Sequence, residues 1–150
     1  MRNVKDILNN KPAPSNVTTS STLVIDALKM LNTVNLSYLI VKDGEEFQGV
    51  FCERDYSRNV ILKGRSSSNT KVEEVMTTDL PIVDINETVE HCMNLMISHR
   101  SRYLLAYDQS DFMGVITIHD LLRQVIANKE QVFDYSVAEK LLSHEEGRIY

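Results

Sequence analysis

Apolar and polar residues follow one pattern along the chain, and that pattern occurs twice. Each half has a short β-branched run, a segment with apolar residues at helical spacing, two apolar runs separated by a polar turn, and a second helical segment. In the first half these pieces are 15–19, 22–34, 38–51 and 53–64, and in the second half they are 80–84, 88–100, 103–116 and 119–129. The pattern therefore predicts the order β-α-β-β-α, twice.

The two halves also share individual residues. The stretch GVFCERD at 49–55 recurs as GVITIHD at 114–120. A shift of 66 residues aligns the first strand and helix by identical letters, and a shift of 65 aligns everything from Tyr38 onward. Self-similarity at a fixed period indicates a repeat architecture, here with one residue lost before Tyr38. A weaker similarity between VKDIL at 4–8 and VEEVM at 72–76 predicts a short lead-in helix before each repeat.

The repeat predicts an α+β fold with mixed sheets. A repeat of about 60 residues buries too little apolar surface to be secure alone. We therefore expect the two repeats to pack sheet to sheet about a pseudo-two-fold axis. The expected domains are 1–66 with the first lead-in helix, 67–128, and a helical tail at 129–150. The Ser-rich segment 64–71 is the expected joint, or alternatively a polar loop.

Composition narrows the function classes. With 43% hydrophobic and 25% charged residues the chain is globular, and a net charge of -5 argues against nucleic-acid polymers and acidic membranes as partners. No apolar run approaches the ~20 residues that span a bilayer, and the N-terminus has no signal-peptide core, so we expect a cytoplasmic protein. Cys52 and Cys92 form no CxxC pair and are expected to be reduced. Neither a metal-ligand spacing nor a catalytic motif is found in the sequence, which predicts a non-enzyme.

These residues resemble a tandem pair of CBS domains, the module named after cystathionine β-synthase. The resemblance rests on the doubled segment Gly-hydrophobic-x-(Ser/Thr)-x-x-Asp and covers about residues 2–128. ERDYSRNVILKGRSS and VEEVMT look like the stand-alone subgroup, which carries no enzyme or transporter. The resemblance implies two clefts for adenosyl ligands: AMP first, then ADP, ATP, NAD or S-adenosylmethionine. It also implies a homodimer in which ligand binding regulates a protein partner.

The second copy of the motif carries the strongest candidate site. Gly114 can let the backbone approach a ligand closely. Thr117 is expected at a strand end, where its hydroxyl can donate to a phosphate beside free helix N–H groups. Asp120 follows in the first helical turn, where its carboxylate can accept both ribose hydroxyls, as the matching residue does in the resembled family. The alternative is that Asp120 only caps its helix.

The first copy departs from the family pattern, because Cys52 occupies the place of the hydroxyl residue before Asp55. A thiol is a weaker hydrogen-bond partner than a hydroxyl. We therefore expect the Asp55 site to bind more weakly, or to bind a different ligand.

The turn before the second hairpin supplies further candidates. In many relatives the residues matching Arg100 and Arg102 reach the ligand's phosphates, which guanidinium groups suit by charge and geometry. Solvated surface charge is an equal alternative. Tyr103 stands where the family often has His, so it is expected either to stack on a base or to fill the core.

The adenine is expected to lie against the first strand of a repeat. In the resembled family, backbone groups there read the base, which points to Val17 in the first repeat and to Pro81, Ile82 and Val83 in the second. All four residues could equally belong to the core.

The resulting interpretation is a regulatory, energy-sensing module that binds an adenosyl nucleotide and has no catalysis of its own. The alternative is a ligand-independent scaffold for dimerisation or partner docking. The tail is expected to form a helix that packs on its own module or at a dimer interface. Its signals are a capping box at Ser136 and Glu139 and an apolar face made of Phe133, Val137, Leu141 and Leu142.

Overall fold

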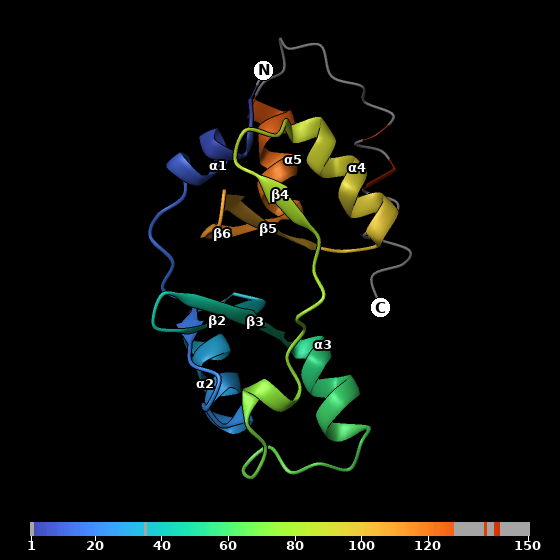
Figure 1. Ribbon diagram of the computed structural model, residues 1–150. Coiled ribbons are helices and arrows are strands. Elements are labelled where there is room, and N and C mark those ends of the chain that lie inside the picture. Colours follow the sequence, from blue (N-terminus) through green and yellow to red (C-terminus); the bar gives the residue numbers. More distant parts are fainter. Residues whose placement is uncertain (1, 35, 128–136, 138–139, 142–150) are drawn as a thin grey trace. The chain divides into compact units, whose positions relative to one another are not determined.

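The chain forms two compact units, each built around one three-stranded sheet (Figure 1). The computed structural model describes residues 2–34, 36–127, 137, 140 and 141. Ala13–Asp79 make the repeat-1 unit, and Met1–Pro12 with Leu80–Tyr150 make the repeat-2 unit. No helix among these described residues is long and apolar enough to cross a membrane.

The repeat-1 unit contains a mixed sheet with the order β1-β2-β3. Its elements are β1 (Val17–Thr18), α2 (Val24–Val34), β2 (Tyr38–Asp43), β3 (Glu46–Cys52), α3 (Glu53–Tyr56), the π-helical turn η1 (Ser57–Ile61) and the 3-10 turn η2 (Val72–Glu74). Strand β1 runs parallel to β2, and β2 pairs antiparallel with β3.

The repeat-2 unit has the same sheet, with the order β4-β5-β6. Its elements are α1 (Val4–Asn10), β4 (Ile82–Asp84), α4 (Val89–His99), β5 (Tyr103–Asp108), β6 (Asp111–Thr117) and α5 (Ile118–Ala127). The predicted order β-α-β-β-α and the predicted α+β class are confirmed in both units. The predicted packing of one sheet on the other stays a prediction.

The two repeats match at a constant shift of 65 residues, so the predicted loss of one residue before Tyr38 is wrong. Helices α2 and α4 span 24–34 and 89–99, which differ by 65 at both ends. Their buried positions agree as well, since Val24, Ala27 and Leu31 in α2 correspond to Val89, Cys92 and Met96 in α4. The shift of 66 followed identical letters, whereas burial follows the face of the helix that packs on the sheet.

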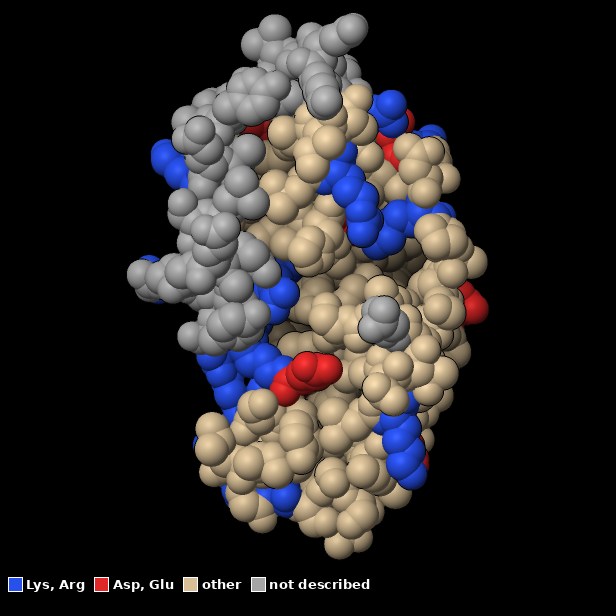
Figure 2. Space-filling view, turned by 180° about the vertical axis from the view of Figure 1, so that it is seen from behind, with Lys and Arg blue, Asp and Glu red and all other residues tan. Residues whose placement is uncertain are grey.

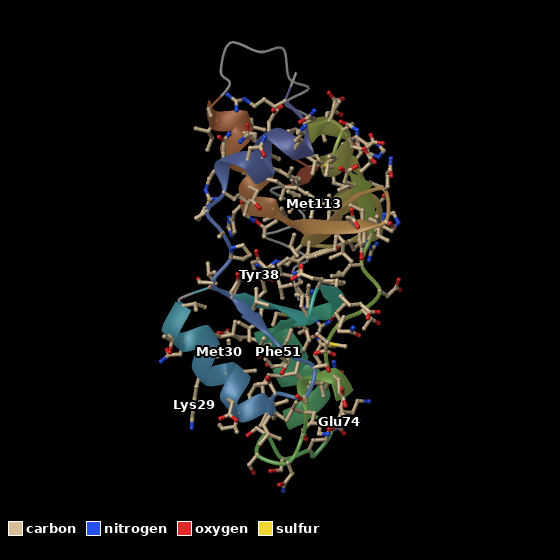
Figure 3. The ribbon with its side chains drawn as sticks, turned by 60° about the vertical axis from the view of Figure 1, so that its left-hand side comes forward. Lys29, Met30, Tyr38, Phe51, Glu74 and Met113 are labelled. Atoms are coloured by element: carbon tan, nitrogen blue, oxygen red, sulfur yellow. The ribbon has the colours of Figure 1, made fainter. Side chains whose placement is uncertain are left out.

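Each sheet buries one face under its helices. In the repeat-1 unit, α2 and the β2–β3 hairpin enclose Leu39, Val41 and Phe51 in one apolar cluster. Figure 3 shows Phe51 on the helix side of the sheet and Tyr38 on its other side. Phe51 pairs with Leu39, and Tyr38 is the strand neighbour of Leu39, so its side chain points to the opposite face.

The lead-in segments pack on the opposite repeats, which moves the spatial boundaries away from the predicted 66/67 border. Helix α1, from the N-terminus, lies beside β6 and α5 in Figure 1 and buries Val4 and Ile7 in the core of the repeat-2 unit. The second lead-in forms η2 and buries Val72 and Val75 in the repeat-1 unit. An apolar face in the sequence predicts packing but does not say which repeat receives it.

The Ser-rich segment 64–71 lies inside the repeat-1 unit and has a structural role there. The backbone carbonyls of Thr70 and Ser67 accept hydrogen bonds from the N–H groups of Val24 and Ile25, at 2.8 and 3.0 Å. These N–H groups open α2 and have no partner within the helix. The segment that was expected to be a joint thus caps a helix.

The tail contributes to the core of the repeat-2 unit. Val137 and Leu141 are buried in the same apolar cluster as α4 and α5. This favours the expectation that the tail packs on its own module. The predicted capping box at Ser136 and Glu139, together with Phe133 and Leu142, lies outside the described residues.

Candidate functional site

Asp120 occupies the strand–helix junction that the sequence predicts. It is the third residue of α5, and Thr117 is the last residue of β6. The Thr117 N–H donates to Asp120 Oδ2 at 2.9 Å, and the Asp120 N–H donates to Thr117 Oγ1 at 3.2 Å. This reciprocal pair is a capping box. Asp120 therefore caps α5, which was the alternative role predicted for it, whatever else it does.

Two cations share the Asp120 carboxylate. Lys11 Nζ donates to Oδ2 at 2.9 Å and also to the Val115 carbonyl at 3.0 Å. Arg123 Nη1 donates to Oδ1 at 3.3 Å. The Asp120 side chain is 4% exposed, whereas the Arg123 side chain is 74% exposed. Within the described part of the chain, Oδ2 thus accepts from Thr117 and Lys11, and Oδ1 accepts from the exposed Arg123.

Asp55 occupies the same junction in the repeat-1 unit but has different partners. The Cys52 N–H and Sγ–H donate to Asp55 Oδ2, at 2.9 and 3.4 Å. The Thr77 hydroxyl donates to Oδ1 at 2.8 Å. Asp55 is 5% exposed, and each of these donors is uncharged. The two motif aspartates therefore sit in similar geometry with different electrostatics.

Burial raises the pKa of Asp55 above its ordinary value of 3.8, and hydrogen bonds from Cys52 and Thr77 only partly oppose this effect. A raised pKa means that the folded state favours the protonated acid. The stabilising contribution is therefore complete below the ordinary pKa and is lost as pH rises through the raised one.

This sign gives a testable pH dependence. We expect the free energy of unfolding of wild type, relative to Asp55→Asn, to fall as pH rises from about 3.5 towards 7, because only wild type must bury an ionised carboxylate. Urea unfolding at a series of pH values measures it. Asp43→Asn is a control of opposite sign, since hydrogen bonds from Ser20 lower the pKa of Asp43. Its contribution is present above the ordinary pKa and is lost as pH falls. An unchanged difference between wild type and Asp55→Asn would contradict the expectation.

Both thiols are buried and protonated at neutral pH. Burial raises the pKa of Cys92 to about 12, and burial followed by the charge of Asp55 raises the pKa of Cys52. Because the thiolate is the reactive form, we expect neither cysteine of the native protein to react with a thiol-specific aromatic disulfide at pH 8. Both should react at once in denaturant. Fast labelling of one thiol in the native protein would contradict this.

The two motif glycines make room for the lead-in segments. A Cβ on Gly49 would lie 2.8 Å from the Thr77 carbonyl oxygen and 2.9 Å from Met76 Sδ. A Cβ on Gly114 would lie 3.0 Å from Leu8 Cδ2. The Thr77 carbonyl thus requires glycine at position 49, and the backbone φ of 155° favours glycine at position 114.

The turn before β5 meets the Asp120 site at the end of the sheet. Tyr103 pairs with Thr117 in the strand ladder, and the Ile118 N–H donates to the Arg102 carbonyl at 3.2 Å. Arg102 is half-buried and Tyr103 is buried. Arg100 is exposed and ends α4 in a left-handed conformation, with φ 50°. The structure thus brings the backbone of Arg102 and Tyr103 to the Asp120 junction and uses the Arg100 backbone as a helix cap.

The residues predicted to contact adenine lie at two strands, Val17 on β1 and residues 81–83 at β4, and they differ in burial. Val83 packs its side chain in the helix-covered core. Ile82 is exposed, and Pro81 and Val17 are half-buried. The Pro81 carbonyl already accepts the Leu105 N–H at 2.9 Å. Contact of these residues with adenine stays a prediction.

Sequence reasoning missed Lys11 and Thr77, the lead-in residues that contact the two aspartates. Lys11 lies three residues after the first lead-in segment, 4–8, and Thr77 lies one residue after the second, 72–76. That position was the available signal, but it does not say which repeat the segment joins. Among the described residues, no group of three or more His, Cys, Asp or Glu side chains could hold a metal ion.

Comparison with known proteins agrees with this architecture. A family model described as CBS domain matches residues 72–127. The structure of a protein with CBS domains from Burkholderia ambifaria MC40-6 is 37% identical, with a TM-score of 0.76, and the match covers 89% of this chain and 99% of that one. The structure of CBSX2 in complex with AMP is 25% identical, with a TM-score of 0.68, over 85% of this chain and 98% of that one.

A curated relative is similar over a shorter share of its length. CBS domain-containing protein CBSX3, mitochondrial, from Arabidopsis thaliana is 35% identical over 113 residues, which are 72% of this chain and 55% of that protein. The chain thus spans about half the length of this relative, and nearly the whole of the Burkholderia structure at more than a third identity. Together with the doubled motif and the two matching units, these similarities show that the chain belongs to the CBS-domain family.

Proposed function

We propose that this chain is a regulatory module that binds an adenosyl nucleotide, with AMP the first candidate, and that it does no catalysis of its own. The observation that carries the proposal is the buried carboxylate of Asp120 at a strand–helix junction with basic side chains around it. The AMP complex of the similar protein CBSX2 supports the ligand class.

The carboxylate of Asp120 has one oxygen available for ribose. Oδ2 is engaged by Thr117 and Lys11, while Oδ1, among the residues that the structure describes, is bonded to the exposed Arg123. A ribose hydroxyl donating to Oδ1 would displace a flexible, solvated guanidinium, which costs little. The displaced Arg123 would then be free to meet the ligand's phosphate. Binding at Asp120 therefore needs a side-chain exchange and no change of backbone.

Positive charge near this site suits an anionic ligand. Lys11 and Arg123 both form ion pairs with Asp120, so two cations meet one carboxylate at this junction. Figure 2 shows Lys and Arg surface on both units, although the chain as a whole carries a net charge of -5. A local excess of cations favours a nucleotide phosphate over an uncharged nucleoside.

The Asp55 site is proposed as the weaker of the two. We expect Cys52→Ser to tighten binding there about five-fold, because a hydroxyl is a better donor and helix cap than a thiol. Calorimetric titration with AMP in an Asp120→Ala background isolates this site. Thr117→Cys is the reciprocal change, and it should weaken the Asp120 site by a similar factor. If the Asp55 site binds AMP equally well with Cys52 and with serine, the missing hydroxyl does not explain weaker binding there.

A thermal-shift panel with AMP, ADP, ATP, NAD, NADH and S-adenosylmethionine tests the proposal. A ligand at a hundred times its dissociation constant should stabilise the protein by roughly 2.7 kcal/mol. Stabilisation by one adenosyl compound supports the sensor. A well-folded protein that responds to none of them would leave the alternative, a ligand-independent scaffold. The capped, ion-paired state of Asp120 favours that alternative, since these contacts stabilise the fold without a ligand.

Three further properties belong to the same proposal. The module acts as a homodimer, its ligand changes its affinity for a protein partner, and it resides in the cytoplasm. A change in partner affinity requires that the ligand bind the two states of the module unequally. The name of the relative CBSX3 includes mitochondrial, so a targeting experiment should accompany any cellular test.

A further inference from the structure

Both lead-in segments end on the same two groups of the opposite repeat, a valine carbonyl and the carboxylate of the motif aspartate. In the repeat-1 unit, the Thr77 N–H donates to the Val50 carbonyl at 2.8 Å and the Thr77 hydroxyl donates to Asp55 Oδ1 at 2.8 Å. In the repeat-2 unit, the ammonium of Lys11 donates to the Val115 carbonyl and to Asp120 Oδ2, the oxygen that also accepts the Thr117 N–H, whereas Thr77 uses the oxygen of Asp55 that the cap leaves open. Each valine and each aspartate matches its counterpart at the shift of 65. The motif therefore receives a lead-in segment in both repeats.

We propose that Lys11 is a positioning residue for the Asp120 site, and that through it the lead-in helix α1 docks as part of that site. The half that concerns ligand affinity rests on the proposed function. The half that concerns docking of α1 does not.

The ion pair between Lys11 and Asp120 is the tie that holds one end of α1 to α5. The other end is held by backbone hydrogen bonds from Val4 to Glu87 and from Lys5 to Ile85, at 3.0 and 2.8 Å. Lys11 is the C-cap residue of α1, where a cation is favoured by the helix dipole. Its partner carboxylate lies 109 residues away in the sequence, on α5. Loss of the ammonium would leave a buried carboxylate short of a cation, and loss of the carboxylate would release the end of the helix.

Lys11 also fixes which oxygen of Asp120 meets a ligand. Its ammonium and the Thr117 N–H both hold Oδ2, which leaves Oδ1 facing the exposed Arg123. A ligand on Oδ1 and Lys11 on Oδ2 do not compete for an oxygen, and Lys11 holds the carboxylate in the orientation that presents Oδ1 to the ligand. Ligand binding is therefore expected to tighten the docking of α1, and docking of α1 to raise affinity.

Hydrogen exchange of the ligand-free protein tests the docking half. Peptides spanning residues 4–10 should exchange about ten-fold faster in Lys11→Met and in Asp120→Asn than in wild type, because the helix opens more often. Lys11→Arg should restore the wild-type rate, and Asp43→Asn should leave it unchanged. Wild-type exchange of α1 in both Lys11→Met and Asp120→Asn would overturn the tie.

The ligand half uses AMP as the probe. We expect Lys11→Met to bind AMP about ten-fold more weakly at a temperature where circular dichroism shows it fully folded, and Lys11→Arg to recover most of that loss. Saturating AMP should slow exchange of residues 4–10 in wild type but not in Lys11→Met. Equal protection in the two proteins would overturn the coupling. If wild type binds no AMP, the proposed AMP function and its coupling fail, while the exchange of the ligand-free variants still decides the tie.

Discussion

Asp120→Ala is expected to weaken AMP binding by about 10- to 100-fold, measured by calorimetric titration of the folded protein. The ribose hydroxyl on Oδ1 would lose a charged acceptor, and a hydrogen bond to a charged group contributes ~1.5–3 kcal/mol. The effect should exceed that of any other single change at this site, because Asp120 is where the cap, Lys11 and the ligand would meet.

Two variants separate ligand binding from folding. Asp120→Asn keeps an oxygen for the Thr117 N–H and removes the charge, so it should retain the helix cap and still bind AMP poorly. Asp43→Ala removes a carboxylate that is bonded to Ser20, away from the motif, and should bind AMP like wild type. Wild-type affinity in Asp120→Ala would end the ribose assignment, whatever the stability of that variant.

The helices and strands of the repeats could be predicted from the sequence, because helical spacing and strand alternation depend on residues close together in the chain. Val24, Ala27 and Leu31 fall on one helical face and are buried, as their spacing predicts. The register between repeats was misread by one residue in the first strand and helix, where Val17 and Val83 are identical in letter but occupy different positions. Burial and strand pairing, which place Val17 with Ile40 and Ile82 with Leu105, could not be read from one sequence.

The site was predictable only in part, for a similar reason. The doubled motif located Asp55 and Asp120, since a carboxylate in the first turn of a helix is a local signal. Lys11 and Thr77 were not predicted, because their roles depend on which repeat each lead-in segment packs against. Gly114 was predicted to let a ligand approach closely, whereas in the structure Gly114 has a φ of 155° and Gly49 lies against the Thr77 carbonyl of the lead-in segment.

Gly49→Ala is expected to destabilise the protein by about 2–3 kcal/mol, and Gly49→Val by more. The added Cβ would lie 2.8 Å from the Thr77 carbonyl oxygen. That oxygen cannot easily retreat, because Thr77 and Val50 exchange backbone hydrogen bonds in both directions, at 2.9 and 2.8 Å. Relief of the contact would separate the lead-in segment from β3 and remove the Thr77 hydroxyl from Asp55. Urea unfolding measures the loss.

Adding Met76→Ala to Gly49→Ala shows which neighbour causes the loss of stability. Met76 Sδ also lies within 2.9 Å of the added Cβ, but it is part of a flexible side chain that can turn aside. If the Thr77 carbonyl is decisive, Met76→Ala should recover little of the lost stability in the double variant. Full recovery would assign the cost to Met76, and the glycine would then serve side-chain packing alone. An unchanged stability in Gly49→Ala would mean that the lead-in segment does not pack on β3 as the structure has it.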